Sequence, residues 1–446
     1  MAESNVVAPI FRWANGWIAD DIFTGINNSY FYSENIEIRE NSKWISLSKK
    51  LKQNTTLPSE IDVMTRVTPD LLVAWWASGK CYKYGNSWAE VTTWLSKARY
   101  SAIAFNNYLY RCHNNELYKV AISDIEFNST VTPTKVTDLE YSTYHPMLVS
   151  MGDLYIWNWP KLWKVDANWV YSNMFTLEAW WIIVKLNDLW WVIRVITQSS
   201  LWTPNVYLWN WVSKTPDETI PLTWYTVYQS LVYNGYPYIV TDKWLGILDW
   251  YRIYQLKKCT DFANLFNSNW IWVYDERLVI AWRNGIYSRW AKNKNYNEVL
   301  SYDYVANWRI TCIYSDWMNL FVAWNNNWSC WVDKLSSDYN TTGYLITRWY
   351  YANSLKEVKE WIMAGIWYSE LREWESIEIQ YSVDWWSFTS LRTITPSTDT
   401  IESFTEDLFV RDRFQYIQFK IILNWNWETT PSFYALDLLF NNNVLR

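Results

Sequence analysis

Short runs of alternating apolar and polar residues, bounded by Asn, Asp and Trp, make up most of the chain. Val, Ile, Tyr, Thr and Leu dominate these runs, which is typical of strands that bury one face. No long segment places apolar residues at the 3.6-residue period of a helix. The pattern therefore predicts an all-β protein built from many short antiparallel strands.

A strand–turn–strand unit recurs roughly every 35 to 50 residues between about residue 60 and residue 340. Its first strand often reads "LYxW" or "LxVAW". The seven copies begin with Leu71–Trp75, Asn107–Arg111, Asp153–Trp157, Asn205–Trp209, Tyr236–Val240, Arg277–Trp282 and Asn319–Trp324. Their expected partners are Cys81–Tyr84, Glu116–Val120, Lys161–Val165, a shorter segment near Val212, Leu245–Leu248, Gly285–Arg289 and Ser329–Asp333.

Seven copies at this spacing predict a β-propeller of about seven blades over residues 56–343. A four-stranded blade needs about 40 residues. One small blade cannot bury both faces of its sheet, whereas radial stacking buries both and protects the edges. The blade count is expected to within one blade, and two stacked β-sandwiches are the alternative architecture.

The period ends near residue 343, and residues 344–446 are expected to form a small antiparallel β-sandwich. Its clearest signal is a strand, Glu375–Asp384, that turns through Trp385-Trp386 into Ser387–Leu391. Further strands are expected at 401–404, 414–423 and 433–440. Residues 1–55 contain one alternating strand, Phe31–Arg39, and are expected to be an arm that closes the propeller ring or reaches a neighbouring subunit.

Composition changes the interpretation of the turns, because the chain has 38 Trp and only 10 Gly. Average usage of about 7% Gly would give roughly thirty. Many Trp follow Asn or Asp or stand in pairs, where turns would have Gly. These are Asn158-Trp159, Asn168-Trp169, Asn210-Trp211, Asp249-Trp250, Asn269-Trp270, Asp316-Trp317, Asn327-Trp328, Asn424-Trp425, Asn426-Trp427, Trp75-Trp76, Trp180-Trp181, Trp190-Trp191 and Trp385-Trp386.

Asn-Gly, Asp-Gly and Gly-Gly are typical of type I′ hairpin turns, whose central residues need positive φ. The bulky side chain of Trp is strained in that conformation. We therefore hypothesise that many of these Trp stand for Gly, encoded by a UGA codon that some lineages read as Gly and some translation tables read as Trp. The alternative is a genuinely Trp-rich protein, such as a sugar binder with aromatic platforms.

Charge and cysteine content narrow the function classes. The net charge is −6, and no basic stretch of the kind that nucleic-acid binding requires is present. Five Cys, none in CxxC spacing, predict buried free thiols in a reducing compartment: Cys81, Cys112, Cys259, Cys312 and Cys330. The first residues do not resemble a signal peptide, and charges interrupt the apolar segment 180–195, so no membrane span is expected.

Candidate catalytic residues are few. The two histidines, His113 and His145, are expected at turn or surface positions rather than in a metal or acid–base site. Three adjacent carboxylate pairs exist: Asp20 with Asp21, Asp275 with Glu276, and Glu406 with Asp407. Adjacent strand residues point to opposite faces, so none of these is by itself the facing pair that glycoside hydrolysis needs.

Cofactor and metal signatures are also missing from the sequence. No P-loop, dinucleotide fingerprint, HExxH or GxSxG occurs, even with Gly written for every Trp. The Asn-rich turns at 325–328 and 424–427 lack the carboxylates of a calcium loop. The sequence thus predicts no catalytic, cofactor-binding or metal-ligating residue and no cofactor.

The segment 12–21, the strand Phe31–Arg39, the propeller repeats and the hairpin around Trp385-Trp386 together resemble phage-type virion proteins. That resemblance implies a non-enzymatic structural or host-contact role in a tail, neck or fibre assembly, in a virion assembled in the host cytoplasm. It implies other virion proteins as partners, and leaves open a homo-oligomer and a cell-surface glycan.

Two other functions remain open at this point. A propeller can also carry a carbohydrate-binding or carbohydrate-cleaving site, because fold alone does not decide function. A cellular scaffold of the WD40 kind is a weaker alternative, since the Trp-Asp strand endings and Gly-His pairs of that repeat are missing.

Overall fold

The computed structural model describes residues 5–12, 30–38, 44–58, 60–76, 81–85, 87–91, 102–113, 115–140, 145–158, 160–166, 171–177, 182–189, 192–198, 205–210, 212–222, 226–249, 252–258, 271–282, 285–291, 298–305, 309–316, 319–326, 328–351, 359–396, 404–409, 413–425 and 429–441. The N-terminal segment 13–29, Cys259 and most of the Asn-Trp and Asp-Trp pairs lie outside these residues.

The described strands form seven four-stranded antiparallel sheets, which are the blades of a propeller, together with two larger sheets. The first blade contains β6 (Ile61–Thr68), β7 (Leu71–Trp76), β8 (Cys81–Tyr84) and β9 (Trp88–Val91). The second contains β10 (Ala102–Phe105), β11 (Tyr108–His113), β12 (Glu116–Ala121) and β13 (Thr134–Asp138). The third contains β14 (Met147–Ser150), β15 (Asp153–Asn158), β16 (Lys161–Val165) and β17 (Tyr171–Thr176).

The fourth blade contains β18 (Ile182–Leu189), β19 (Val192–Gln198), β20 (Asn205–Trp209) and β21 (Glu218–Pro221). The fifth contains β22 (Val227–Tyr233), β23 (Tyr236–Thr241), β24 (Trp244–Asp249) and β25 (Arg252–Lys258). The sixth contains β26 (Ile271–Tyr274), β27 (Arg277–Trp282), β28 (Gly285–Ala291) and β29 (Glu298–Val305). A short helix, α1 (Ile122–Phe127), follows β12.

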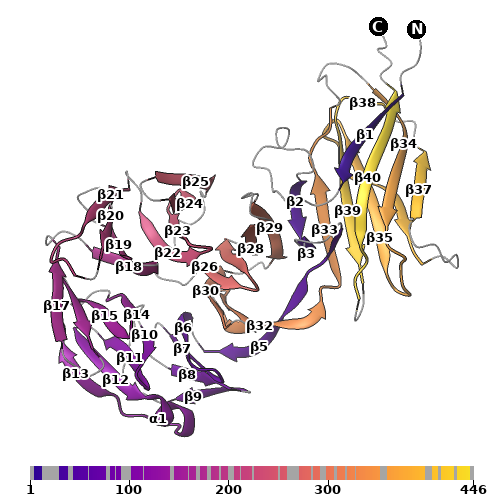
Figure 1. The fold of residues 1–446 in the computed structure, drawn as a ribbon. Helices are drawn as coiled ribbons and strands as arrows, with labels where there is room; N and C mark the ends of the chain where they lie inside the picture. The colour runs from indigo at the N-terminus through magenta and orange to yellow at the C-terminus, as the bar shows by residue number, and fades with distance from the viewer. Residues whose placement is uncertain are drawn as a thin grey trace. The chain divides into compact units, whose positions relative to one another are not determined.

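The seventh blade is completed by a strand from the other end of the chain. Its order is β30 (Arg309–Ser315), β31 (Leu320–Asn325), β32 (Cys330–Tyr339) and then β5 (Lys49–Leu57). The first strand of each blade lies beside the first strand of the next, and β30 lies beside β6, so the blades form a closed ring (Figure 1). The predicted all-β propeller of seven blades is confirmed.

Burial explains why the repeat is visible in the sequence. The second strand of a blade lies between other strands of its own sheet and between the neighbouring blades, so both of its faces are covered. Nearly every residue of β15, β23 and β31 is accordingly buried. These strands are the source of the nearly continuous apolar runs, and contacts between successive blades build the apolar clusters of the ring.

The fourth blade departs from the predicted repeat. Asn205–Trp209 is its third strand, β20, and pairs with β19 and β21. The expected partner near Val212 is wrong, because Val212 lies in an exposed bend and the partner is β21. The second strand is β19, which pairs antiparallel with β18. Trp75 and Trp76, expected at a turn, instead end strand β7.

The two larger sheets form a β-sandwich. One contains β1 (Asn5–Arg12), β3 (Ile36–Ile38), β4 (Ile45–Leu47), β34 (Lys359–Tyr368), β37 (Phe404–Phe409), β38 (Arg413–Phe414) and β40 (Phe433–Asn441). The other has the order β2 (Tyr30–Glu34), β33 (Thr342–Thr347), β39 (Ile417–Asn424), β35 (Ser376–Val383) and β36 (Thr389–Ile394).

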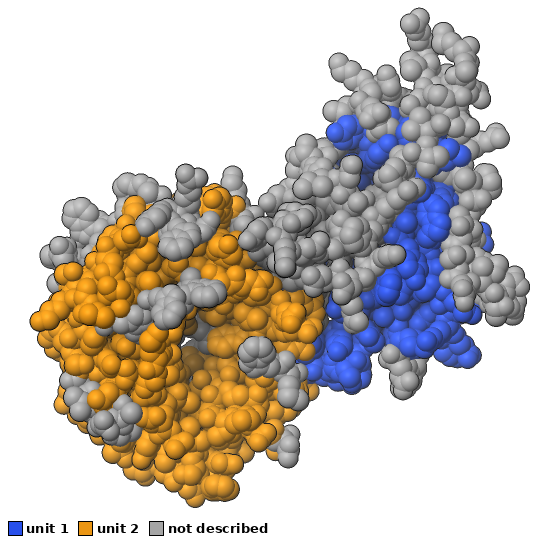
Figure 2. Space-filling model, viewed as in Figure 1, with its two compact units in different colours: residues 1–52, 285–307, 335–446 blue, residues 53–284, 308–334 orange. Residues whose placement is uncertain are grey.

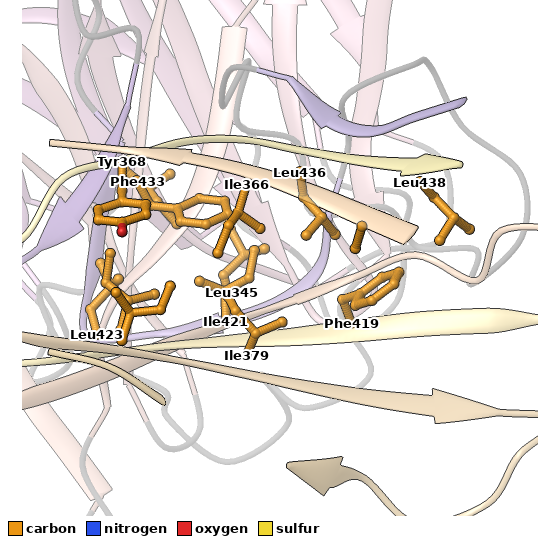
Figure 3. Close-up of a cluster of buried hydrophobic side chains, with 14 of the residues drawn as sticks. Leu345, Ile366, Tyr368, Ile379, Phe419, Ile421, Leu423, Phe433, Leu436 and Leu438 are labelled. Atoms are coloured by element: carbon orange, nitrogen blue, oxygen red, sulfur yellow. The ribbon is translucent and has the colours of Figure 1, made fainter. Parts of the chain in front are cut away.

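Alternate residues of the two sheets face each other and form one apolar core. Leu345, Ile379, Phe419 and Ile421 from one sheet meet Ile366, Phe433, Leu436 and Leu438 from the other (Figure 3). In β39 every second residue is buried in this core from Ile417 to Leu423. The alternation that predicted strands here thus reflects a sandwich with one dry and one outer face per sheet.

The first 55 residues contribute to both parts rather than forming a part of their own. β1 to β4 pair within the sandwich sheets, and β5 pairs within the last propeller blade. The chain divides into two compact units, one of residues 1–52, 285–307 and 335–446 and the other of residues 53–284 and 308–334 (Figure 2). The chain passes between the two units four times: within β5, between β27 and β28, between β29 and β30, and within β32.

The junction between the last and first blades contains a buried ion pair. Arg66 Nη1 lies 2.9 Å from Asp316 Oδ2, and the Asp316 side chain is only 2% exposed. Tyr314 Oη accepts a hydrogen bond of 2.9 Å from the backbone N–H of Arg66. These contacts join β30 to β6, where the ring closes.

Replacing Arg66 by Met should therefore destabilise the propeller by about 2–4 kcal/mol, because the buried Asp316 carboxylate would lose its positively charged partner while keeping its hydrogen bonds from Asn319. The exposed pair Lys161–Glu140 serves as control, and Lys161→Met should cost less than about 1 kcal/mol. Urea unfolding of both variants measures the difference. Equal losses of unfolding free energy in the two variants would show that the junction ion pair stabilises the protein no more than an exposed pair does.

Candidate functional site

Polar side chains on the first strands of successive blades contact one another around the propeller. Ser150 at the end of β14 donates a hydrogen bond to Asp188 on β18. Asn187 on β18 donates to Ser230 Oγ on β22 at 2.6 Å, and Gln229 on β22 exchanges two hydrogen bonds with the backbone of Ile271 on β26. Each bond joins a blade to the next.

The same arrangement continues to the ring junction. Tyr233 on β22 donates to the backbone oxygen of Glu276 at 2.7 Å, and the indole N–H of Trp272 on β26 donates to the backbone oxygen of Ser315 at 2.8 Å. These groups use their hydrogen-bonding capacity between blades. The first strands therefore carry a structural belt, which we call the inner belt: Ser150, Asn187, Asp188, Gln229, Ser230, Tyr233 and Trp272.

Buried thiols in the described part of the chain are structural. Cys81 and Cys112 lie beside the buried guanidinium of Arg111, and burial raises the pKa of each thiol to about 12 despite that positive charge. Burial also lowers the pKa of Arg111 to about 10. Because the thiolate is the reactive form, both thiols stay protonated and unreactive near neutral pH.

The structure places the carboxylate pairs as follows. Asp275 and Glu276 are the two central residues of the β26–β27 turn, with φ of 48° and 58°. Asp275 Oδ2 lies 3.5 Å from Arg277 of the same hairpin. Glu406 and Asp407 are successive residues of β37, and Asp20 and Asp21 lie outside the described residues. Within the described ranges, no group of three His, Cys, Asp or Glu could hold a metal ion.

The histidines differ in burial. His113 ends β11 and is half-buried, with its ring centroid 6.2 Å from that of Tyr118. His145 was expected at a surface or turn position and is instead buried, with Nδ1 2.7 Å from the backbone oxygen of Trp157. The expectation was wrong because the local sequence around His145 and Pro146 does not indicate that the strand containing Trp157 covers this side chain.

The most developed polar surface of the sandwich is the outer face of the β2–β33–β39–β35–β36 sheet. Tyr32 and Glu34 on β2 lie there next to Tyr344 on β33, with Glu34 directly opposite Tyr344. On the next two strands of the sheet, Lys420 of β39 and Gln380 of β35 lie opposite each other. We call Tyr32, Glu34, Tyr344, Gln380 and Lys420 the tyrosine face.

Contacts within the tyrosine face hold its side chains in place. The ring centroids of Tyr32 and Tyr344 are 5.7 Å apart, and Lys420 Nζ lies 4.1 Å from the centroid of the Tyr344 ring, a cation–π distance. Burial, followed by a hydrogen bond with the Glu34 carboxylate, raises the pKa of the Tyr344 hydroxyl. Burial and the Glu34 charge also raise the pKa of Tyr32.

Chemically, this face offers aromatic rings, hydroxyl groups and both signs of charge. Tyr offers a rigid ring and a hydroxyl at little loss of side-chain entropy, and is therefore enriched where proteins contact partners. The alternation in β33 and β39 marks these residues as outward-facing. Sequence reasoning did not group them, because Glu34, Tyr344 and Lys420 come together only through the pairing of distant strands.

Comparisons with known proteins give structural neighbours only. No family model and no curated protein matches the chain. The extracellular domain assigned to a hybrid two-component system from B. thetaiotaomicron is 15% identical, with a TM-score of 0.48, over 73% of this chain and 44% of that one. The chain thus spans less than half the length of that neighbour.

Two further neighbours are smaller. The Dos1 propeller is 10% identical with a TM-score of 0.46, over 66% of this chain and 89% of that one. The N-terminal domain of Nup159 is 9% identical with a TM-score of 0.40, over 69% of this chain and 100% of that one. The architecture described above rests on the strand pairing itself. Among the described residues, no helix has the length and apolar character needed to span a bilayer.

One half-buried carboxylate, that of Asp333, gives the propeller unit a pH dependence. Burial raises the pKa of Asp333 on β32 from 3.8 to about 6, although the neighbouring indole groups of Trp331 and Trp324 act in the opposite direction. Between these two pKa values the folded protein holds a proton that the unfolded chain has released. The free energy of unfolding should therefore fall as the pH rises through this window.

Replacing Asp333 by Asn should remove that fall and raise stability at pH 7 by about 1–2 kcal/mol, allowing for partial solvent screening. Urea unfolding of both proteins across the window from below 3.8 to above 6 measures it. Parallel pH profiles for the two proteins would contradict the assignment.

Proposed function

We propose that the chain is a non-enzymatic structural or host-contact component of a phage virion, in a tail, neck or fibre assembly. Its partners in this proposal are other virion proteins, in a virion that is assembled in the host cytoplasm. A further copy of the chain or a cell-surface glycan is the second class of partner.

The observation that carries the proposal is the way the two ends of the chain are interlocked. β1 to β4 from the N-terminal region and β33 to β40 from the C-terminal region share the sandwich sheets, and β5 completes the last blade. Opening either part requires breaking hydrogen bonds along whole strands. A fold tied in this way suits a protein that stays assembled under mechanical load.

The tyrosine face supplies a surface for contact. Glu34 and Lys420 give it both charge signs, and Tyr32 and Tyr344 give it ring area and hydroxyl groups. Its charged groups are held by neighbours within the face, so little side-chain entropy remains to be lost on binding. This composition fits a protein partner, because mixed aromatic and charged groups are typical of protein–protein contacts.

One observation favours carbohydrate binding as a second candidate function. The ring of Trp385 lies 4.7 Å from that of Trp349 and 6.0 Å from that of Tyr416, and Trp385 and Trp386 are largely exposed. Exposed aromatic rings can stack on sugar faces. The cluster lies at the β35–β36 hairpin, and it can bind a sugar in this way only if the natural protein has Trp at position 385.

The proposal is tested by locating the chain on particles. Antibodies against the recombinant protein should label one substructure of purified phage particles in electron micrographs, and the chain should be found among the particle proteins by mass spectrometry. Particles that carry neither label nor peptide would overturn the virion assignment.

The contact surface is tested with the double variant Tyr344→Ala, Lys420→Ala. Binding to the neighbouring particle protein identified by cross-linking should weaken at least tenfold, because the paired ring and charge are lost together. Lys161→Ala on the propeller is the matched control and should bind normally. Unchanged binding by the double variant would exclude the tyrosine face, and specific binding to a glycan array would favour the second candidate.

A further inference from the structure

We infer that the natural protein carries glycine at positions 374 and 385, where the printed sequence has Trp. The inference stands on the backbone conformation at these two positions and is independent of the proposed function. It assigns individual residues within the broader hypothesis that Trp replaces Gly in this chain. It also decides whether the aromatic cluster at the β35–β36 hairpin exists.

Trp385 occupies the glycine position of a tight hairpin turn. Asp384 and Trp385 have φ of 47° and 71°, and the backbone N–H of Trp386 donates to the oxygen of Val383 at 2.9 Å. Two successive positive φ values closed by this bond define a type I′ turn. Asp-Gly is among the preferred sequences of that turn, so Asp384 already matches its first central position.

The protein contains the same turn with glycine elsewhere. Met151-Gly152 joins β14 to β15 with φ of 49° and 80°, and Asn234-Gly235 joins β22 to β23 with φ of 49° and 78°. Trp385, at 71°, is closer to these glycines than Asn107 at 61° or Glu276 at 58°, which hold the corresponding place in two other turns.

Trp374 occupies a glycine position of a different turn. Its φ is 75°, whereas that of Glu373 is not positive, and the N–H of Glu375 donates to the oxygen of Arg372 at 2.9 Å. Positive φ at only the second central residue is the type II turn, which favours Gly there. A bulky side chain with positive φ is a true outlier. Trp374 is also 69% exposed, so burial of the ring gives little in return.

Other described Trp mark the limit of the inference. Trp157, Trp209 and Trp324 are buried within strands, so not every Trp of the chain occupies a turn position. Trp272 donates its indole N–H to the adjacent blade, and its ring centroid is 4.9 Å from that of Tyr314. Trp328 is 96% exposed but does not have positive φ. Only positions 374 and 385 combine Trp with the left-handed region among the described residues.

The direct test is the mass of one tryptic peptide, Glu373–Arg392, from protein isolated from its natural source. This peptide contains both positions and no internal Lys or Arg. Fragment spectra should show Gly at 374 and 385, as a UGA codon decoded as glycine would produce. Trp at either position would overturn the inference for that position.

A second test uses the recombinant printed sequence. Trp385→Gly and Trp374→Gly should each raise the folding equilibrium constant about tenfold by removing the left-handed strain. Trp385→Ala should gain clearly less, because Ala keeps the Cβ atom that causes the strain. Trp328→Gly is the matched exposed control and should give no gain. Equal effects of Gly and Ala at 385, or a loss at both turn positions, would contradict the conformational argument.

Discussion

A four-stranded sheet of short strands cannot bury both of its faces alone, and this constraint governs the whole propeller. Each blade covers its faces with the next blade, so the arrangement is complete only when the last blade meets the first. β5 supplies the missing fourth strand of that last blade, and Arg66, Tyr314 and Asp316 join it to the first blade's inner strand. The inner belt continues this joining from the third blade to the seventh through side-chain hydrogen bonds.

The same N-terminal region ties the sandwich. β1 and β4 pair with β40, β2 pairs with β33, and β3 pairs with β4. The N-terminal region that closes the ring therefore also belongs to the sandwich sheets. The polar groups with the clearest geometry either bind blades together or stand on the outer face of a sandwich sheet. In our proposal the first set of polar groups holds the scaffold together and the second set offers a contact surface, which is the physical basis of the proposed structural or host-contact role.

Much of this architecture is readable in the sequence, and the exceptions have physical causes. Asp153–Asn158 and Leu320–Asn325 are buried on both faces, so their apolar runs are evident. β5 was not recognisable as a blade strand, because its exposed edge position lets it consist largely of Lys, Gln, Asn and Thr. β19 was not recognised as the second strand of its blade, because the third strand, Asn205–Trp209, carries the repeated strand pattern instead. The tyrosine face depends on pairing between strands far apart in sequence, which no local pattern reports.

Hydrogen–deuterium exchange of the β5 amides tests the central claim, that the N-terminal strand closes the ring, most directly. If β5 is the fourth strand of the last blade, its hydrogen-bonded amides should exchange as slowly as those of β31 and β32, at the rate of global unfolding. Rapid exchange throughout Lys49–Leu57 while β31 and β32 remain protected would show a free arm and would contradict the closed ring.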